Sequence, residues 1–470
     1  MKEFKKLFDF TDFTRLENNV DISLNNIKQL NPTLNAFCNV YEEEFKNNSK
    51  SILEKINSKK NKDLAGLIIG IKDLFCYKDH PVQAASKILD KFISPYNATV
   101  VERILNNDGL IVGHQNCDEF GMGSSNEHSI YGCVHNYFDY NKTSGGSSGG
   151  SAVAVQTDMC HISLGTDTGG SIRQPAAFCG IIGFKPSYGV ISRYGVIAHA
   201  SSFDTVGILG KKIKDIKTVF KTIMGHDGHD LSMSQELPNE IVEEKKKYKI
   251  GYLKNALEFE GLQEEIKKSI QNFLGKLQDE QNIIESVEVD FLDYVVPVYY
   301  VLTTAEACSN LARYDGVRYG YRTASYSNFE ELITKTRSEG FGEEVKKRIM
   351  LGNYIFKTRE ENNYFSKAQQ VREKIKNAFH EIFNNYDFLI LPTTTTTAFK
   401  INDISNDDEK SYWSDIFTVI ASLVGLPAIS IPYGVDKNNM PIGLQIIANK
   451  NKDFNLLNFL FKKKVMMNLW

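Results

Sequence analysis

The stretch SGGSSGGS occupies residues 144–151, and a second glycine-rich turn, TDTGGS, follows at residues 166–171. Runs of glycine and serine often form flexible linkers. This run is short, however, and the apolar, helix-competent residues 152–155 follow it at once. A linker also has no need to lead into a second glycine-rich turn. We therefore expect both stretches to belong to a folded site, with a linker as the alternative.

The second turn ends in Ser171 and offers a place for nucleophilic chemistry. Paired glycines allow a backbone to approach a ligand closely, and successive N–H groups can form a nest that binds anions. A serine at the end of such a nest can attack a carbonyl group while nearby N–H groups receive the developing negative charge. The sequence has no G-x-x-x-x-G-K-[ST] phosphate loop. A tight turn before a helix that starts at Ile172 remains the structural alternative.

A nucleophilic serine needs a base. The nine histidines, His199 among them, lie in no G-x-S-x-G or comparable context. Lys72 ends the apolar run GLIIGIK of residues 66–72 and directly precedes Asp73. A lysine at the end of a buried strand would be partly desolvated, which favours its neutral form. Lys72 is thus a candidate base, and an ordinary surface lysine is the alternative.

The order of the expected elements indicates an α/β fold. Residues 66–72 and 110–113 are typical of strands, with a short helix at 98–105 between them. Later strands and amphipathic helices are expected at 249–253, 262–277, 371–382, 386–391, 428–431 and 442–447. Because strands lie on both sides of the glycine-rich region, we expect one large sheet in a single domain over residues 1–470. Residues 1–60 should form a helical segment, and residues 225–247 a polar surface excursion.

Composition narrows the class of protein. The 470 residues are 42% apolar and 24% charged, as in soluble globular proteins. A net charge of −3 argues against a generic nucleic-acid binder. No segment has the roughly 18 apolar residues of a membrane span, and the first residues carry acids where a signal peptide would be apolar. Seven scattered cysteines without a C-x-x-C pair argue against zinc and fit a reducing compartment. We expect a cytoplasmic protein that does not bind membranes.

The glycine-rich stretches and the lysine together resemble the amidase-signature hydrolases. The matching motifs are GIKD (70–73), GGSSGGS (145–151) and GGSIR (169–173), and the resemblance runs over essentially the whole chain. It implies an α/β fold with a mixed central sheet covered by helices on both faces. It also implies that Lys72 is the base, that Ser147 follows a cis peptide bond and passes the proton, and that Ser171 is the nucleophile.

Within that family the chain is similar to the glutamine-hydrolysing subunits of tRNA-dependent amidotransferases. The stretches that carry this likeness are SIRQPAAFCG (171–180), NLARYDGVRYG (310–320), KRIMLGNY (347–354) and GLPAISIP (425–432). The resemblance implies that Arg348 pairs with the substrate α-carboxylate and Asp415 with its α-ammonium. Tyr299 or Tyr300 would close the pocket. The N–H groups near Thr168, Gly169 and Gly170 would receive the oxyanion.

The resemblance also implies partners. Ammonia would travel to a larger B-type subunit that binds tRNA and uses ATP and Mg²⁺ to amidate Glu-tRNA(Gln), with Asp-tRNA(Asn) as a further candidate. A small C-type subunit would wrap around this chain, which itself would hold no cofactor and no metal. Two alternatives stay open: a stand-alone amidase acting on small or aryl amides, and a non-catalytic scaffold. A pair of charged residues, Arg348 and Asp415, that binds a free amino acid would argue against the stand-alone amidase. The presence of Lys72, Ser147 and Ser171 together would argue against the scaffold.

Some positions depart from the family pattern or suggest other chemistry. Ser144 stands where the family usually has proline, the stretch 392–397 lacks a second proline, and the chain stops early at Trp470. These departures bear on loop rigidity and partner contacts. The segment HDGHD (226–230) has the residue types of a metal site, but its polar, loop-like surroundings lead us to expect none. Asp167 and Arg173 flank the second turn and should fix its shape.

Overall fold

The computed structural model describes residues 15–241, 245–357, 363–403 and 413–462. One 11-stranded sheet runs through it in the order β1-β3-β2-β4-β6-β5-β10-β11-β9-β7-β8. The strands are β1 (Phe37–Val40), β2 (Ile68–Lys72), β3 (Leu110–Gln115), β4 (Ile162–Asp167), β5 (Ile182–Lys185), β6 (Thr205–Gly210), β7 (Lys249–Leu253), β8 (Ile283–Val287), β9 (Phe388–Pro392), β10 (Ala428–Val435) and β11 (Pro441–Ala448).

The sheet is mixed. Strand β2 pairs parallel with both β3 and β4, and β7 pairs parallel with β8 and β9. Between these two parallel groups, the neighbours from β4 through β6, β5, β10 and β11 to β9 are antiparallel. Helix α3 (Thr99–Asn106) links β2 to the parallel β3, as the strand–helix–strand pattern predicted. The expectation of one mixed sheet fed by the whole chain is therefore confirmed.

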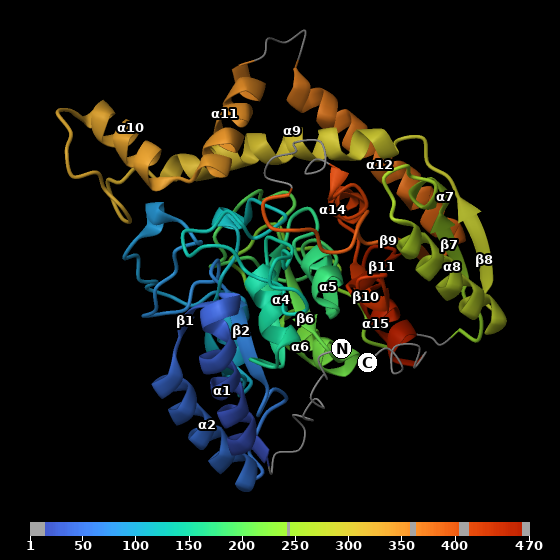
Figure 1. Cartoon of the computed structure of the whole chain (residues 1–470), viewed down its shortest axis with the longest axis horizontal. Coiled ribbons are helices and arrows are strands. Elements are labelled where there is room, and N and C mark those ends of the chain that lie inside the picture. Colours follow the sequence, from blue (N-terminus) through green and yellow to red (C-terminus); the bar gives the residue numbers. More distant parts are fainter. Residues whose placement is uncertain (1–14, 242–244, 358–362, 404–412, 463–470) are drawn as a thin grey trace.

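Helices cover both faces of the sheet (Figure 1). On β2, Ile69 and Ile71 point into one core while Ile68 points into another, as strand alternation requires. The first face packs against α3, α6 (Ile213–Ile223), α7 (Lys254–Leu257), α8 (Glu264–Asp279) and α15 (Asp453–Lys462). The second packs against α1 (Leu16–Leu34), α2 (Glu42–Asn57), α4 (Gly149–Gln156), α5 (Arg173–Cys179), α9 (Leu292–Asn310), α12 (Tyr364–Asn385) and α14 (Val419–Val424).

Helix α9 carries two further helices away from the sheet. The α10 helix (Phe329–Gly340) and the α11 helix (Glu343–Lys357) follow it in sequence, and α11 packs along α9 (Figure 1). This arrangement matters for the site because α9 carries Tyr299 and α11 carries Arg348. No helix in the described ranges is both long and apolar enough to cross a membrane.

Two expectations need correction or restriction. Residues 1–60 were expected to be helical, but β1 intervenes between α1 and α2 and pairs with β3; residues 1–14 lie outside the described part. The polar excursion at 225–247 has no helix or ladder strand in its described residues, apart from an isolated bridge between Gly225 and Ile191. Residues 242–244 within it, and the chain end at Trp470, are also outside the described part.

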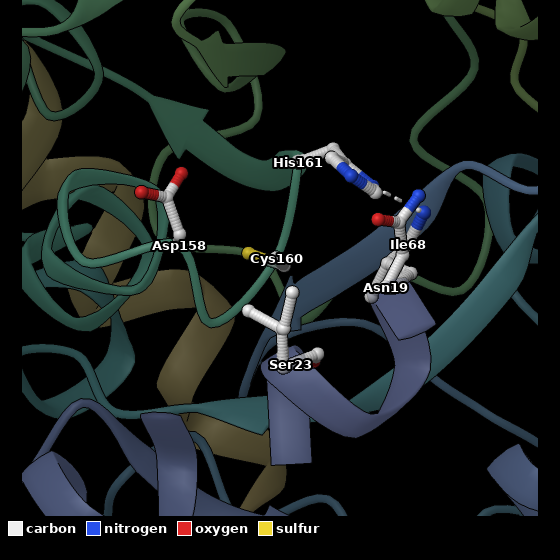
Figure 2. Close-up of a pocket in the computed structure, with 7 residues that line it drawn as sticks. Asn19, Ser23, Ile68, Asp158, Cys160 and His161 are labelled. Carbon is white, nitrogen blue, oxygen red and sulfur yellow. Dashed lines mark hydrogen bonds between the residues drawn. The ribbon is translucent and has the colours of Figure 1, made fainter. Parts of the chain in front are cut away.

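A polar contact joins helix α1 to the turn between α4 and β4. The Ser23 hydroxyl donates to the carbonyl of Met159 at 2.5 Å. A cavity of about 20 Å³ remains beside this contact (Figure 2), lined by Asn19, Ile22, Ser23, Ile68, Asp158, Cys160 and His161. There the N–H of Ile68 donates to Nδ1 of His161 at 3.1 Å. That volume suits roughly one water molecule, so this cavity is too small to hold a substrate.

Candidate functional site

Lys72 lies at the end of β2 with its side chain fully buried. Its Nζ donates to Oγ of Ser147 at 2.7 Å, and to two further hydroxyls, Ser148 at 3.0 Å and Thr166 at 2.9 Å. No described carboxylate forms an ion pair with it. Burial lowers the pKa of the Lys72 ammonium from its usual range, and more distant acids only partly offset this. The surroundings therefore favour an uncharged amine.

The three hydroxyls around this amine are not equivalent. The Ser148 hydroxyl donates its own proton to the carbonyl of Thr166 at 3.2 Å, so towards Lys72 it can only accept. An uncharged amine has two N–H groups and one lone pair. It can thus donate to Ser148, and its lone pair can accept a proton from Ser147 or Thr166. The geometry therefore allows Ser147 to be the proton donor to this base.

The serine-rich loop is a rigid part of the fold rather than a linker. Residues 144–151 are all buried, and the Gly146–Ser147 peptide bond is cis, as the family resemblance implied. The N–H of Gly146 donates to Oε1 of Gln174 at 2.9 Å, and the N–H of Gly149 to Oδ1 of Asn126 at 2.9 Å. These bonds fix the loop on both sides of Ser147.

The turn before Ser171 needs both of its glycines. Gly170 has φ +151°, and a Cβ there would lie 2.3 Å from Oγ1 of Thr418. A Cβ on Gly169 would lie 2.6 Å from the ring of Tyr299, so this tyrosine packs directly on the turn. The carbonyl of Gly170 accepts from the N–H of Gln174 at 2.8 Å as α5 begins.

The N–H groups of this turn are available to a ligand. No described residue accepts a hydrogen bond from the N–H of Thr168, Gly169 or Gly170. The Thr168 side chain, in contrast, is fixed, because its hydroxyl donates to Oδ1 of Asp204 at 2.7 Å. A carbonyl oxygen bound here would meet donors that are already oriented, as an oxyanion site requires.

Ser171 lies beside the serine-rich loop and is 8% exposed. Its carbonyl accepts from the N–H of Ser148 at 3.3 Å, which brings the two glycine-rich stretches together. Within the described residues, no hydrogen bond joins the hydroxyl of Ser171 to that of Ser147. The Lys72–Ser147 contact is therefore formed and the Ser147–Ser171 contact is not. Catalytic hydrogen bonds are often long in ligand-free enzymes and tighten when substrate binds.

A buried ion pair holds the turn in place. Arg173 binds both carboxylate oxygens of Asp167, at 2.8 and 2.9 Å, and neither side chain is exposed. The remaining guanidinium N–H groups donate to the carbonyl of Thr418, to Gln445 and to Ser422. All five donors of Arg173 are thus used within the protein. The pair fixes the shape of the turn and is not free to bind substrate.

The substrate-binding candidates come from three separate elements. On α11, Nε of Arg348 donates to Oε1 of Glu344 at 2.7 Å, and its guanidinium carbon lies 5.5 Å from the ring centre of Tyr300. Asp415 precedes α14, and no described residue donates to its carboxylate. Burial raises the pKa of Asp415 to about 7, although the Arg348 charge acts in the opposite direction. The charge of Arg348 acts on Asp415, although the two side chains form no ion pair with each other.

Sequence reasoning missed several residues around this site. Ser148 and Thr166 share the Lys72 amine. Asp204 binds the Thr168 hydroxyl and accepts from the N–H groups of His199 and Ala200. Burial raises the pKa of Asp204 to about 6. Nothing local marked these roles, since each depends on a contact between segments far apart in the chain.

The carboxylates of the 226–230 segment bind protein donors. Oδ2 of Asp227 accepts from the hydroxyls of Thr99, at 2.6 Å, and Ser192. Asp230 pairs with Arg193 at 3.0 Å. Across the described residues, no group of three or more His, Cys, Asp or Glu side chains has the arrangement of a metal site. The segment serves to fasten loops to each other.

Comparison with known proteins gives a consistent result. The family model described as Amidase matches residues 18–457. The A subunit of glutamyl-tRNA(Gln) amidotransferase from Ruminiclostridium cellulolyticum is 41% identical over 453 residues, with 94% of this chain and 92% of that protein covered. The protein of the same name from Nitrosomonas europaea is 44% identical over 439 residues, covering 93% and 90%.

Solved structures agree with the sequence comparisons. The crystal structure of the glutamyl-tRNA(Gln) amidotransferase A subunit from Thermotoga maritima matches with a TM-score of 0.79 and 34% identity, covering 97% of this chain and 94% of that one. A 6-aminohexanoate cyclic dimer hydrolase matches with a TM-score of 0.83 at 19% identity, covering 100% and 98%. At that identity the second likeness concerns the fold alone.

Proposed function

The chain belongs to the amidase family, and we propose that within it the chain hydrolyses glutamine as the amidase component of a tRNA-dependent amidotransferase. One observation carries the chemistry: a buried amine, Lys72 Nζ, lies 2.7 Å from the Ser147 hydroxyl and forms no ion pair with a carboxylate of the described residues. Identity above 40% over more than nine tenths of the chain to A subunits of glutamyl-tRNA(Gln) amidotransferases supports the choice of reaction.

The first half of the reaction forms an acyl-enzyme. The neutral Lys72 amine takes the proton of Ser147, and Ser147 takes the proton of Ser171. Oγ of Ser171 then forms a bond to the side-chain amide carbon of glutamine. The carbonyl oxygen becomes an oxyanion that accepts from the N–H groups of Thr168, Gly169 and Gly170. Oriented donors of this kind typically contribute about 10²–10³-fold each to kcat.

The second half returns the proton and the enzyme. As the tetrahedral intermediate collapses, the C–N bond breaks and the nitrogen receives the proton stored on Lys72 through Ser147, leaving as ammonia. Water then attacks the Ser171 ester and loses its proton along the same path. Glutamate leaves, and Ser171 regains its hydroxyl. Each proton taken up by Lys72 is given back within one cycle, so no cofactor is required for these steps.

Substrate selection rests on the two charged candidates. A free amino acid needs one cation and one anion to orient it, and arginine can grip a carboxylate with two parallel hydrogen bonds. We assign the α-carboxylate to Arg348 and the α-ammonium to Asp415. Tyr299, which packs on Gly169, would close the pocket over the reacting amide.

The proposal extends to the partners and the setting of the reaction. The released ammonia would pass to a larger tRNA-binding subunit that uses ATP and Mg²⁺ to amidate Glu-tRNA(Gln), and a small third subunit would complete the complex. The work belongs to protein biosynthesis in the cytoplasm. The net charge of −3 on this chain suits a division of labour in which the partner binds the tRNA.

The test is ammonia release from glutamine by the chain purified with its partner subunits. Ser171→Ala should abolish it, while Ser269→Ala, on helix α8, should leave it intact. Glutaminase activity that survives Ser171→Ala would exclude the mechanism. Co-purification with a larger ATP-using protein and a small one would support the assignment of partners.

A stand-alone amidase for small or aryl amides is the second candidate. An amidase and a 6-aminohexanoate cyclic dimer hydrolase match with TM-scores of 0.79 and 0.83, as high as the 0.79 of the amidotransferase A subunit, so the fold does not separate the two candidates. Arg348 and Asp415 do, because a hydrophobic amide has no charged groups for them. Rapid turnover of simple amides together with none of glutamine would decide for this alternative.

A further inference from the structure

His199 is a buried histidine whose ring has no partner. It is 3% exposed, and neither Nδ1 nor Nε2 makes a hydrogen bond in the described structure. An unpaired polar group in the interior typically destabilises a fold. Buried groups of this kind call for an explanation. The other fully buried histidine, His114, shows the usual situation: Nδ1 is 2.5 Å from the Tyr41 hydroxyl and Nε2 is 2.8 Å from the Phe75 carbonyl.

The backbone of His199 is fixed to the proposed glutamine site from two sides. Its N–H donates at 2.9 Å to Asp204, the same carboxylate that holds Thr168 of the oxyanion turn. Its carbonyl accepts at 3.1 Å from Nδ2 of Asn310, the last residue of α9, the helix that carries Tyr299. The backbone position of His199 is therefore set by contacts that it shares with the proposed site.

The charges of two side chains of the proposed site act on the ring. Burial lowers the pKa of His199 well below its usual value, and the charges of Arg348 and, to a smaller degree, Lys72 lower it further. The imidazole is thus neutral, with a proton on one nitrogen and a lone pair on the other. It lies within electrostatic range of both the proposed carboxylate clamp and the proposed base.

We infer that His199 is a substrate-binding residue of the glutamine site, whose ring N–H donates to the α-carboxylate that Arg348 also binds. A neutral ring that lacks both an acceptor and a donor partner suits an α-amino acid, which offers a carboxylate and an ammonium together. The bound substrate then satisfies the group that the free protein leaves unpaired. This inference rests on the proposed function and adds to it a residue that determines specificity for free amino acids.

The experiment compares His199→Phe, which keeps a ring without nitrogens, and His199→Gln, which keeps a donor and an acceptor. In the full complex, His199→Phe should raise KM for glutamine at least tenfold while kcat changes less than threefold, and His199→Gln should recover most of the loss. Turnover of a simple amide that lacks the α-amino-acid groups should be equal in both variants. The Tm of the free protein should not fall in His199→Phe, because the native ring has no bonds to lose.

The matched control is His114→Phe, which removes a ring with two partners. It should lower Tm and leave KM for glutamine unchanged. An unchanged KM for glutamine in His199→Phe would overturn the inference. It would also be overturned if His199→Phe lowered Tm as much as His114→Phe does and reduced turnover of glutamine and of the simple amide equally. If His199→Phe does not fold, the comparison is made between His199→Gln and His199→Ala. A higher KM for glutamine in His199→Ala than in His199→Gln would support the inference, and equal KM values would overturn it.

Direct binding separates this inference from the proposed function. Calorimetry on Ser171→Ala measures glutamine affinity without turnover, and adding His199→Phe should weaken it at least tenfold. If the wild-type complex releases no ammonia from glutamine, the proposed function fails. The inference about His199 would still stand on a His199-dependent affinity for glutamine, and equal affinity of the two Ser171→Ala proteins would overturn it.

Discussion

Lys72 is surrounded by hydroxyl groups instead of acids, and this choice of neighbours sets its chemistry. A carboxylate at hydrogen-bond distance would hold the proton on the amine, whereas three alcohols compensate burial without favouring the charge. A general base works best with a pKa near the operating pH. In the proposed mechanism, this arrangement would let a lysine do the work that histidine does in most serine hydrolases.

Lys72→Arg tests this account because a guanidinium stays protonated in proteins. We expect kcat for glutamine to fall by about 10²–10⁴-fold, the usual contribution of a general base. The control is Lys211→Arg, which alters another largely buried lysine that pairs with Asp158 at 2.9 Å and should leave turnover unchanged. Initial rates of ammonia release give the measurement. More than a tenth of wild-type activity in Lys72→Arg would contradict the role of a neutral amine.

If Asp415 binds the α-ammonium as proposed, it should give the site a pH dependence. Since burial raises its pKa to about 7, the carboxyl is neutral below that pH and cannot pair with an α-ammonium. We expect kcat/KM for glutamine to rise as pH increases through about 7. Asp415→Asn should raise the KM for glutamine and remove this rise of kcat/KM with pH. The sign for stability is opposite: ionisation of a buried acid with a raised pKa lowers the free energy of unfolding as pH rises towards and through 7. A profile that is the same in Asp415→Asn would exclude the assignment.

At the scale of elements, the site is built where β4 and β2 end and α4 and α5 begin. The Asp167–Arg173 pair ties the end of β4 to the first turn of α5 and to the segment before α14. Such a pair is fully desolvated, so removing one partner leaves an uncompensated charge in the interior.

Arg173→Met should lower the free energy of unfolding by about 3–5 kcal/mol, the usual result of breaking a buried ion pair from one side. Chemical denaturation gives the value. Lys376→Met, which breaks the exposed pair with Glu373 at 3.4 Å, should change it by less than about 0.5 kcal/mol. Equal effects of the two substitutions would show that the buried pair does not hold the turn.

The sequence predicted those elements that have a strong local signal. GLIIGIK became β2, and the strands expected at 249–253, 386–391, 428–431 and 442–447 are all present. The four-residue β1 and β5 were not predicted, because short strands in helical or glycine-rich surroundings have no clear pattern of their own. Strand β1 forms by pairing with β3, and strand β5 forms by pairing with β6 and β10, so contacts with other strands decide that these two segments are extended.

The residues of the candidate site likewise divide into those that the sequence could indicate and those that it could not. Lys72 and Ser171 could be singled out from a strand end and a glycine turn, and the resemblance brought in Ser147, Arg348 and Asp415. His199 could not be found, although it was among the histidines considered. A missing hydrogen-bond partner is a property of the packed interior, and no spacing in the sequence reports it.

At the scale of the whole molecule, the residues of the proposed site come from positions between 72 and 415. They lie on or beside the strands of one continuous sheet and the helices that pack against it. A ligand bound there contacts segments that are adjacent only in the folded state. Binding should therefore stabilise the entire domain rather than one loop.

Ser171→Ala in the presence of glutamine checks this coupling. At a concentration of 100 times Kd, binding to the folded state alone adds about 2.7 kcal/mol to the free energy of unfolding. Tm should rise, and tryptophan fluorescence, to which Trp413 and Trp470 both contribute, should report the same shift as far-UV circular dichroism. Ser171→Ala combined with Arg348→Ala should show no rise. A shift seen by only one of the two probes would mean that the site stabilises a part of the molecule alone.

The strand order has a consequence during synthesis on the ribosome. Strand β5 ends at Lys185 but pairs with β10, which begins at Ala428, so the edge of β5 stays open while roughly 240 more residues are made. At about 5–20 residues per second that wait is on the order of tens of seconds. An open strand edge is a template for wrong pairing between chains. The nascent polypeptide should accordingly depend on chaperones until its last strands emerge from the exit tunnel.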